Sequence, residues 1–247
     1  MDALSKNKTN IKGAKMRKSK ISKFTLEDLL NEEKKSALKK LEEVGAIIVK
    51  GIDRKQISRL YKEIKLFFNA SEETKAKYHF EGKYWGHYIE DKESLTSCKR
   101  EIFEIDRNYL DIEGLEQFDE NSIPQGLWPS YQDFPNLQTA FVPIYNYWFE
   151  LCEKLFGGVS QGFLTAFKYH PDNEAEYKIS EHQDDHYVIA FAPLGEPLEI
   201  FIENKWFAEN LSTSEALIVN PHIKHRVQNK THKERYSVTF IYPIEPI

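Results

Sequence analysis

The sequence is poor in the features that mark secreted, membrane-spanning or disulfide-stabilised proteins. Cys98 and Cys152 are its only cysteines among 247 residues, too few for a disulfide framework and without CxxC spacing. No apolar run approaches the ~18–20 residues that span a bilayer. The start of the chain also lacks the apolar stretch of a signal peptide. We therefore expect a cytoplasmic protein with no membrane partner.

Basic residues are concentrated at the start of the chain. Residues 1–23 contain eight of them against the single acid Asp2, about +7, whereas the whole chain carries −5. The remainder is thus acidic, at about −12, and has no basic stripe. An acidic body argues against a nucleic-acid partner. Residues 1–23, with few apolar side chains, are predicted to form a disordered, solvated tail.

Neither internal repeats nor a long linker divides the rest, so residues 24–247 are predicted to form one domain. Residues 24–159 read as mostly helical. Thr25 is a candidate N-cap for a first helix that closes at Gly45, followed by a short strand over 46–52. Asp53 caps a second predicted helix, and apolar spacing indicates a third over 137–156.

From about residue 160 the pattern changes to short β-prone runs separated by Gly, Pro, Asn and charged turns. These runs cover residues 162–169, 187–193, 198–203, 205–207, 216–220 and 236–242. Helices followed by many short strands favour a mostly β fold with flanking helices, either a sandwich or an open barrel.

The strongest chemical signal in this β-rich half is His182-Gln183-Asp184. Residues i and i+2 of an extended segment point to the same side, so an imidazole and a carboxylate can bind one metal ion together. His225 is the best candidate for a third ligand. Two histidines and one carboxylate on one face leave other positions of an octahedral iron open, as in iron(II) oxygenases.

The pattern His-x-acid is unspecific by itself, and a single histidine is more often a surface or hydrogen-bonded residue. The sequence contains it four times, at 79–81, 170–172, 182–184 and 232–234. His170 and Asp172 are the main rivals, although Pro171-Asp172-Asn173 reads as a turn. His222 is a substitute for His225, ranked below it.

A second signal is Arg235-Tyr236-Ser237, ten residues after His225. Strand alternation places Arg235 and Ser237 on one face and Tyr236 on the other. A guanidinium and a hydroxyl on one face suit a carboxylate, which arginine binds through two parallel hydrogen bonds. The alternative is an edge-strand arginine in a surface ion pair.

Together these residues resemble the isopenicillin N synthase-like family of 2-oxoglutarate- and iron(II)-dependent oxygenases. The resemblance runs from about residue 24 to 245, and its final segments are similar to the HxD, HRV and RxS motifs of that family. In chain order the segments are 45–52, 67–75, 99–105, 127–129, 167–171, 182–184, 225–227 and 235–237.

The resemblance implies a double-stranded β-helix (jelly-roll) core behind a helical N-terminal region. It implies that His182, Asp184 and His225 bind Fe(II), with no catalytic residue beyond these ligands. Arg235 and Ser237 would hold the far carboxylate of 2-oxoglutarate, and Tyr169 would hydrogen-bond near its keto-acid end. The implied reaction hydroxylates a C–H bond of a small-molecule substrate with O2 and releases succinate and CO2. Ascorbate is a further candidate reductant, and the oligomeric state is not indicated.

Two departures from the family pattern stand out. Phe167 replaces the asparagine that precedes the family's tyrosine, and only 40 residues separate Asp184 from His225. Pro221-His222-Ile223-Lys224 replaces a longer excursion, which predicts a more open or differently covered mouth.

Individual residues also argue for or against other functions of the same fold. Asp184 fills the place that halogenases leave for chloride, and Ile241 stands where nucleic-acid demethylases of the AlkB type carry a second arginine. Two alternatives stay open: an iron oxidase of this fold that does not use 2-oxoglutarate, and a jelly-roll binding protein without catalysis. The aromatic stretch Tyr84, Trp85, His87 and Tyr88 either lines a pocket or packs in the core.

Overall fold

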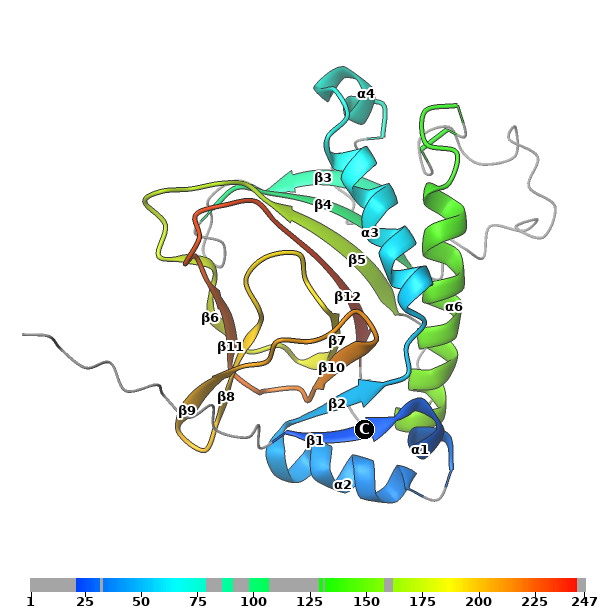
Figure 1. The fold of residues 1–247 in the computed structure, drawn as a ribbon, viewed down its shortest axis with the longest axis vertical. Helices are drawn as coiled ribbons and strands as arrows, with labels where there is room; N and C mark the ends of the chain where they lie inside the picture. The colour runs from blue at the N-terminus through cyan, green and yellow to red at the C-terminus, as the bar shows by residue number, and fades with distance from the viewer. Residues whose placement is uncertain are drawn as a thin grey trace, which may run out of the picture.

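The computed structural model describes residues 21–31, 33–78, 86–90, 98–106, 129–130, 132–157 and 162–243. Two β-sheets face each other, and helices cover the outer face of the larger one (Figure 1). The larger sheet has the order β1-β2-β10-β7-β12-β5-β4-β3, and the smaller has the order β6-β11-β8-β9. The predicted tail falls mostly outside the described residues. Among the described helices, none combines the length and apolar character needed to cross a membrane.

The strands of the larger sheet are β1 (Ser22–Thr25), β2 (Ala46–Lys50), β3 (Gly86–Glu90), β4 (Arg100–Asp106), β5 (Phe163–Tyr169), β7 (His186–Phe191), β10 (Glu215–Val219) and β12 (Arg235–Pro243). Those of the smaller sheet are β6 (Tyr177–His182), β8 (Glu199–Ile202), β9 (Lys205–Ala208) and β11 (His225–Gln228).

From β5 onward the chain passes back and forth between the two sheets. Strands β5, β7, β10 and β12 lie in the larger sheet, and β6, β8, β9 and β11 lie in the smaller one. This alternation makes a double-stranded β-helix, so the predicted jelly-roll core with flanking helices is confirmed. The preceding part of the chain extends the larger sheet at both edges, with β1 and β2 on one side and β3 and β4 on the other.

The described helices are α1 (Leu26–Leu30), α2 (Lys34–Val44), α3 (Arg54–Phe68), α4 (Glu72–Ala76) and α6 (Leu137–Phe156). The caps predicted for two of them are present. Thr25 Oγ1 accepts a hydrogen bond from Asp28 N at 3.1 Å, and Asp53 Oδ1 accepts one from Lys55 N at 2.8 Å. These side chains satisfy backbone N–H groups that the first turn leaves without a partner.

Two predicted boundaries were wrong. The first predicted helix is two helices, because the chain becomes extended at the exposed Asn31, where no buried side chain favours a continued helix. The predicted tail also reached too far. Ser22 and Lys23 belong to β1, which pairs in parallel with β2, and the preceding Ile21 is buried.

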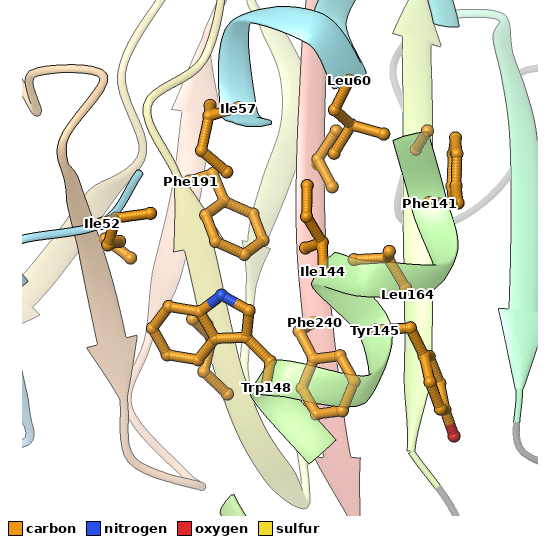
Figure 2. Close-up of a cluster of buried hydrophobic side chains, with 14 of the residues drawn as sticks. Ile52, Ile57, Leu60, Phe141, Ile144, Tyr145, Trp148, Leu164, Phe191 and Phe240 are labelled. Carbon is orange, nitrogen blue, oxygen red and sulfur yellow. The ribbon is translucent and has the colours of Figure 1, made fainter. Parts of the chain in front are cut away.

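The main core lies between the larger sheet and the helices α3 and α6. Trp148 of α6 packs edge-on against Phe191 of β7, with ring centroids 5.4 Å apart. Figure 2 shows Trp148 and Tyr145 projecting from α6 beside Phe240 of β12. Because the helices bury this outer face, the inner face of the sheet is left to form a cavity with the smaller sheet.

Gly45 ends α2 and lies against the side chain of Ile223. Its φ of +86° is left-handed, and a Cβ there would collide with the side chain of Ile223. Gly51 has a similar φ of +88° with nothing within 4 Å of such a Cβ. We expect Gly51→Ala to cost about 1–2 kcal/mol of unfolding free energy from the backbone alone. Gly45→Ala should cost ~1–3 kcal/mol more, because Ile223 must move.

Urea denaturation of both glycine variants measures the difference. An equal loss of unfolding free energy in the two variants would show that the Ile223 side chain moves aside without penalty. The contact between Gly45 and Ile223 would then not hold the β10–β11 turn against α2.

Candidate metal centre and its cavity

Two histidines meet across neighbouring strands of the smaller sheet. His182 is the last residue of β6, His225 is the first of β11, and the antiparallel register pairs them directly. Their ring centroids are 4.1 Å apart. Because directly opposed residues share a face of the sheet, both rings point toward the larger sheet.

Asp184 completes the group. Its backbone carbonyl accepts a hydrogen bond from His222 N at 2.8 Å, and the side chain of Gln183 donates to the His222 carbonyl. These bonds turn the carboxylate back toward the histidines. Asp184 Oδ2 lies 3.2 Å from His225 Nε2, and Asp184 Oδ1 lies 3.7 Å from His182 Nε2. One donor atom from each of the three residues lies within 4.8 Å of the others.

Backbone carbonyls fix the orientation of both imidazoles. His182 Nδ1 is 2.9 Å from Ser180 O, and His225 Nδ1 is 3.0 Å from Ile223 O. Each Nδ1–H therefore donates to the carbonyl two residues earlier, which leaves the Nε2 lone pair directed at the cluster. This arrangement is typical of metal-binding histidines, whose second nitrogen is hydrogen-bonded. Two nitrogens and a carboxylate oxygen fit a divalent transition metal.

The electrostatics of the group favour the protonation states that bind a metal. Burial lowers the pKa of His182, and the neighbouring His225 lowers it further. Burial alone would raise the pKa of Asp184, but the close contact with His225 outweighs this and holds the pKa below its usual range. A neutral imidazole and an ionised carboxylate are the ligand forms that a metal requires.

The rival histidines lie elsewhere or outside the described residues. His170 Nε2 is 2.8 Å from Glu101 Oε1, and Asp172 accepts backbone hydrogen bonds in the predicted turn. The side chain of His222 is exposed, so its backbone serves the cluster and its ring does not. His232 contacts the carbonyl of Asp172, and residues 79–81 lie outside the described residues.

A cavity of about 230 Å³ lies between the sheets, and the three clustered residues line it together with Arg235, Ser237 and Tyr169. The predicted alternation of β12 is confirmed, since Tyr236 belongs to the core on the opposite face. Arg235 is 3% exposed and donates to Glu196 O at 2.8 Å and Ser237 Oγ at 2.7 Å. Within the described part of the chain, no acidic side chain forms an ion pair with Arg235.

Tyr169 lies at the Arg235 end of the cavity. The two residues are opposed in the β5–β12 register, and the guanidinium lies 5.1 Å from the centroid of the tyrosine ring. The predicted hydrogen bond from Tyr169 near the keto-acid end of the co-substrate stays a prediction. Phe167 also lines the cavity and stacks on Tyr169 at 5.9 Å, so an apolar ring occupies the place of the family's asparagine.

Two cavity residues escaped the sequence analysis. His186 Nε2 lies 3.8 Å from Asp184 Oδ2, and its position two residues after Asp184 is a signal that could have found it. Arg100 lines the cavity from β4, and nothing in its sequence context indicated a binding role. His87 is buried next to Glu101, away from the cavity. Tyr84 and Trp85 lie outside the described residues.

Comparison with known proteins gives structural matches alone. No family model matches the chain, and no protein of a curated sequence set matches it. The structure is similar to the dioxygenase for auxin oxidation 1 of Arabidopsis thaliana, crystallised with 2-oxoglutarate (TM-score 0.68, 17% identity, 92% of this chain and 93% of that one). It is also similar to a 2OG-Fe(II) oxygenase family protein from Caulobacter crescentus (0.69, 17%, 91% and 87%).

A third similar structure is the dioxygenase for auxin oxidation in rice (TM-score 0.66, 13% identity, 90% of this chain and 83% of that one). At such identities the likeness shows the fold. The chain therefore has the double-stranded β-helix fold found in structures of 2-oxoglutarate- and iron(II)-dependent oxygenases.

Proposed function

We propose that this chain is an Fe(II)- and 2-oxoglutarate-dependent dioxygenase of the isopenicillin N synthase-like family that hydroxylates a small molecule. One observation carries the proposal. The buried guanidinium of Arg235, without an acidic partner in the described residues, lines the same cavity as His182, Asp184 and His225. A metal-binding face and a carboxylate-binding cation in one cavity are what 2-oxoglutarate requires.

His182, Asp184 and His225 hold the iron in this proposal. Their three ligand atoms lie close together and would hold the metal through two imidazole nitrogens and a carboxylate oxygen. Bound iron supplies the oxidative decarboxylation of 2-oxoglutarate to succinate and CO2, coupled to oxidation of a substrate C–H bond. The carbonyls of Ser180 and Ile223 keep the imidazole rings oriented, so that binding needs no rearrangement of the ligands.

Arg235 and Ser237 hold the far carboxylate of 2-oxoglutarate, and Tyr169 hydrogen-bonds near its keto-acid end. Arg235 is fixed by its hydrogen bonds to Glu196 O and Ser237 Oγ, which pre-organises the fork of the guanidinium. Ser237 and Tyr169 add hydroxyl groups on the same face. A carboxylate bound here also forms an ion pair with the buried guanidinium of Arg235, which is costly to leave unpaired.

Apolar side chains form much of the remaining cavity wall and keep water from the reaction. They include Val188, Ala190, Leu198, Leu211, Leu217 and Ile241. Such a wall suits a small organic substrate better than a nucleic acid or protein.

Removal of the Arg235 charge tests the co-substrate site. In chain loaded anaerobically with Mn²⁺, Arg235→Gln is expected to weaken 2-oxoglutarate binding by about 100-fold, because a charge-assisted bidentate contact is lost. Arg235→Lys should recover only part of the affinity, since lysine keeps the charge and loses the fork. Isothermal titration calorimetry gives the dissociation constants.

Arg59→Gln is the matched control for this titration, because Arg59 is exposed on α3 and contacts Thr139. Near-native 2-oxoglutarate affinity in Arg235→Gln would contradict the assignment. Stoichiometric metal binding without any 2-oxoglutarate binding in the unmodified chain would favour the oxidase that does not use this co-substrate. Failure to bind metal would favour the catalytically silent binding protein.

A further inference from the structure

A second arginine, Arg100, faces the cavity and has no part in the proposed contact with the co-substrate. Arg100 begins β4 and is opposed to Tyr169 of β5, which is in turn opposed to Arg235 of β12. The three residues form a row across the inner face of the larger sheet, with the tyrosine between the arginines. Arg100 and Arg235 therefore approach the cavity from opposite sides of Tyr169.

The side chain of Arg100 extends toward the metal ligands. Its guanidinium lies 5.3 Å from the centroid of the Phe167 ring, one row nearer the middle of the sheet. Arg100 also lines the same cavity as His182 and Asp184. The cation is thus close enough to the proposed iron ligands to hold one end of a molecule that reacts there.

Glu90 fixes Arg100 without occupying the whole guanidinium. Arg100 Nε and Nη2 both lie 2.5 Å from one oxygen, Oε2 of Glu90. The Glu90 side chain is 35% exposed, so water screens part of this ion pair. A guanidinium carries five N–H donors, so donors other than those directed at Glu90 remain for a ligand.

Charge balance inside the cavity leaves Arg100 without a role in co-substrate binding. In the proposed complex the charges of Fe(II) and Arg235 balance those of Asp184 and the two carboxylates of 2-oxoglutarate. Glu209 is the other acid that lines the cavity among the described residues, and it lies after β9 on the smaller-sheet side. Glu90 is partly exposed to water and offsets the charge of Arg100 only in part, so this cation next to apolar walls favours a ligand that brings its own negative charge.

We propose that Arg100 binds a carboxylate of the primary substrate, so that the substrate is a small organic acid with an apolar body. This inference rests on the proposed function, because it assigns Arg235 to 2-oxoglutarate. Phe167 and the aliphatic wall hold the apolar body, and the carboxylate on Arg100 orients it toward the metal face.

Matched acids and amides test the inference directly. Chain loaded with Mn²⁺ and saturating 2-oxoglutarate is titrated with phenylacetate and octanoate, and then with phenylacetamide and octanamide. Saturating 2-oxoglutarate keeps the probes away from Arg235. We expect at least one acid to bind about 10-fold or more tightly than its amide, since the amide cannot form a charge-assisted pair with arginine.

Three variants assign that preference to Arg100. Arg100→Gln should bring the ratio of acid to amide affinity close to one, whereas the exposed-surface variant Arg59→Gln should keep the native ratio. Glu90→Gln should strengthen acid binding several-fold, because it removes the carboxylate that competes for the guanidinium. This third variant keeps Arg100 itself, so it tests the inference even if Arg100→Gln folds poorly.

Each contrary result has a distinct meaning. Equal binding of acids and amides by the unmodified chain, or an acid preference that survives Arg100→Gln, would overturn the assignment of Arg100. A loss of 2-oxoglutarate affinity in Arg100→Gln, with the preference for acids retained, would assign Arg100 to the co-substrate. That result would also overturn its assignment to the primary substrate. Failure of the unmodified chain to bind both Mn²⁺ and 2-oxoglutarate would overturn the proposed function itself, and this inference with it.

Discussion

Asp184→Asn is expected to remove stoichiometric iron binding and to lower any iron-dependent turnover by ~10³-fold or more. Loss of a hydrogen-bonding partner of a metal ligand typically costs 10–100-fold, and loss of the anionic ligand itself should cost more. His182 and His225 would remain 4.1 Å apart between ring centroids, but without the carboxylate that offsets the charge of the metal. Iron content after anaerobic loading and desalting measures the effect.

The neighbouring carboxylate gives a control for this variant within the same loop. Asp185 has a side chain that is 91% exposed and contacts His186 on the outside of the cluster. Asp185→Asn should therefore bind iron like the unmodified chain. Stoichiometric, tightly held iron in Asp184→Asn would show that the metal lies elsewhere.

Glu101→Gln is expected to give the largest loss of stability, about 3–5 kcal/mol of unfolding free energy. Glu101 is 1% exposed, and its Oε2 lies 2.5 Å from Nζ of Lys75, which is 2% exposed. Its Oε1 also lies 2.8 Å from His170 Nε2. Removal of one partner of a buried ion pair is costly, because the buried charge of Lys75 would keep only the exposed Glu72 as its partner. Urea denaturation at neutral pH gives the free energy of unfolding.

Glu72→Gln is the control for Glu101→Gln, because it removes a carboxylate that pairs with the same lysine but is exposed. Glu72 pairs with Lys75 at 2.8 Å, but its side chain is 78% exposed. Glu72→Gln should therefore cost less than ~1 kcal/mol, as exposed ion pairs do. Similar costs for the two variants would mean that the Glu101 cluster is not the anchor that holds α4 to β4.

The same cluster predicts how stability depends on pH. Burial would raise the pKa of Glu101, but hydrogen bonds with His170, His87 and Lys75 outweigh it and hold the pKa well below the ordinary value of 4.5. A depressed carboxyl pKa adds stability above the pKa of the unfolded chain, and this is lost as the pH falls. The difference between the unmodified chain and Glu101→Gln should thus shrink below pH 4.5, whereas a constant difference would contradict this.

Local pattern predicted the elements that have one buried and one exposed face. The helices α3 and α6 place apolar residues at helical spacing against the sheet, and the predicted start of α3 and the predicted extent of α6 agree with the structure. Strand β12 alternates between the core and the cavity, as the residues around Tyr236 indicated. In each case burial against one neighbouring layer leaves a period in the sequence.

The two strands that carry the clustered histidines were not among the predicted ones. β6 and β11 are short, rich in polar residues and largely half-buried, because they face the cavity rather than a packed core. Their pairing depends on chain returns that no local window contains. The His182–Asp184 spacing nevertheless indicated a shared side, since it needs only an extended backbone.

Long-range contacts explain the remaining misses. Arg100 reaches the cavity because β4 pairs with β5, an association that nothing near residue 100 encodes. The position of Tyr169 beside Arg235 likewise follows from the β5–β12 register. The resemblance to a known family supplied the jelly-roll core, which pattern alone had left between a sandwich and an open barrel.

The most direct test of the proposed site is O2-dependent formation of succinate from 2-oxoglutarate by the iron-loaded chain. Uncoupled turnover needs no known substrate, so the measurement depends on the metal and co-substrate sites alone. We expect succinate from the unmodified chain and from Asp185→Asn, and its loss in His182→Ala and Arg235→Ala. Succinate formation that survives both substitutions would contradict the assignment of this cavity as the site of the reaction.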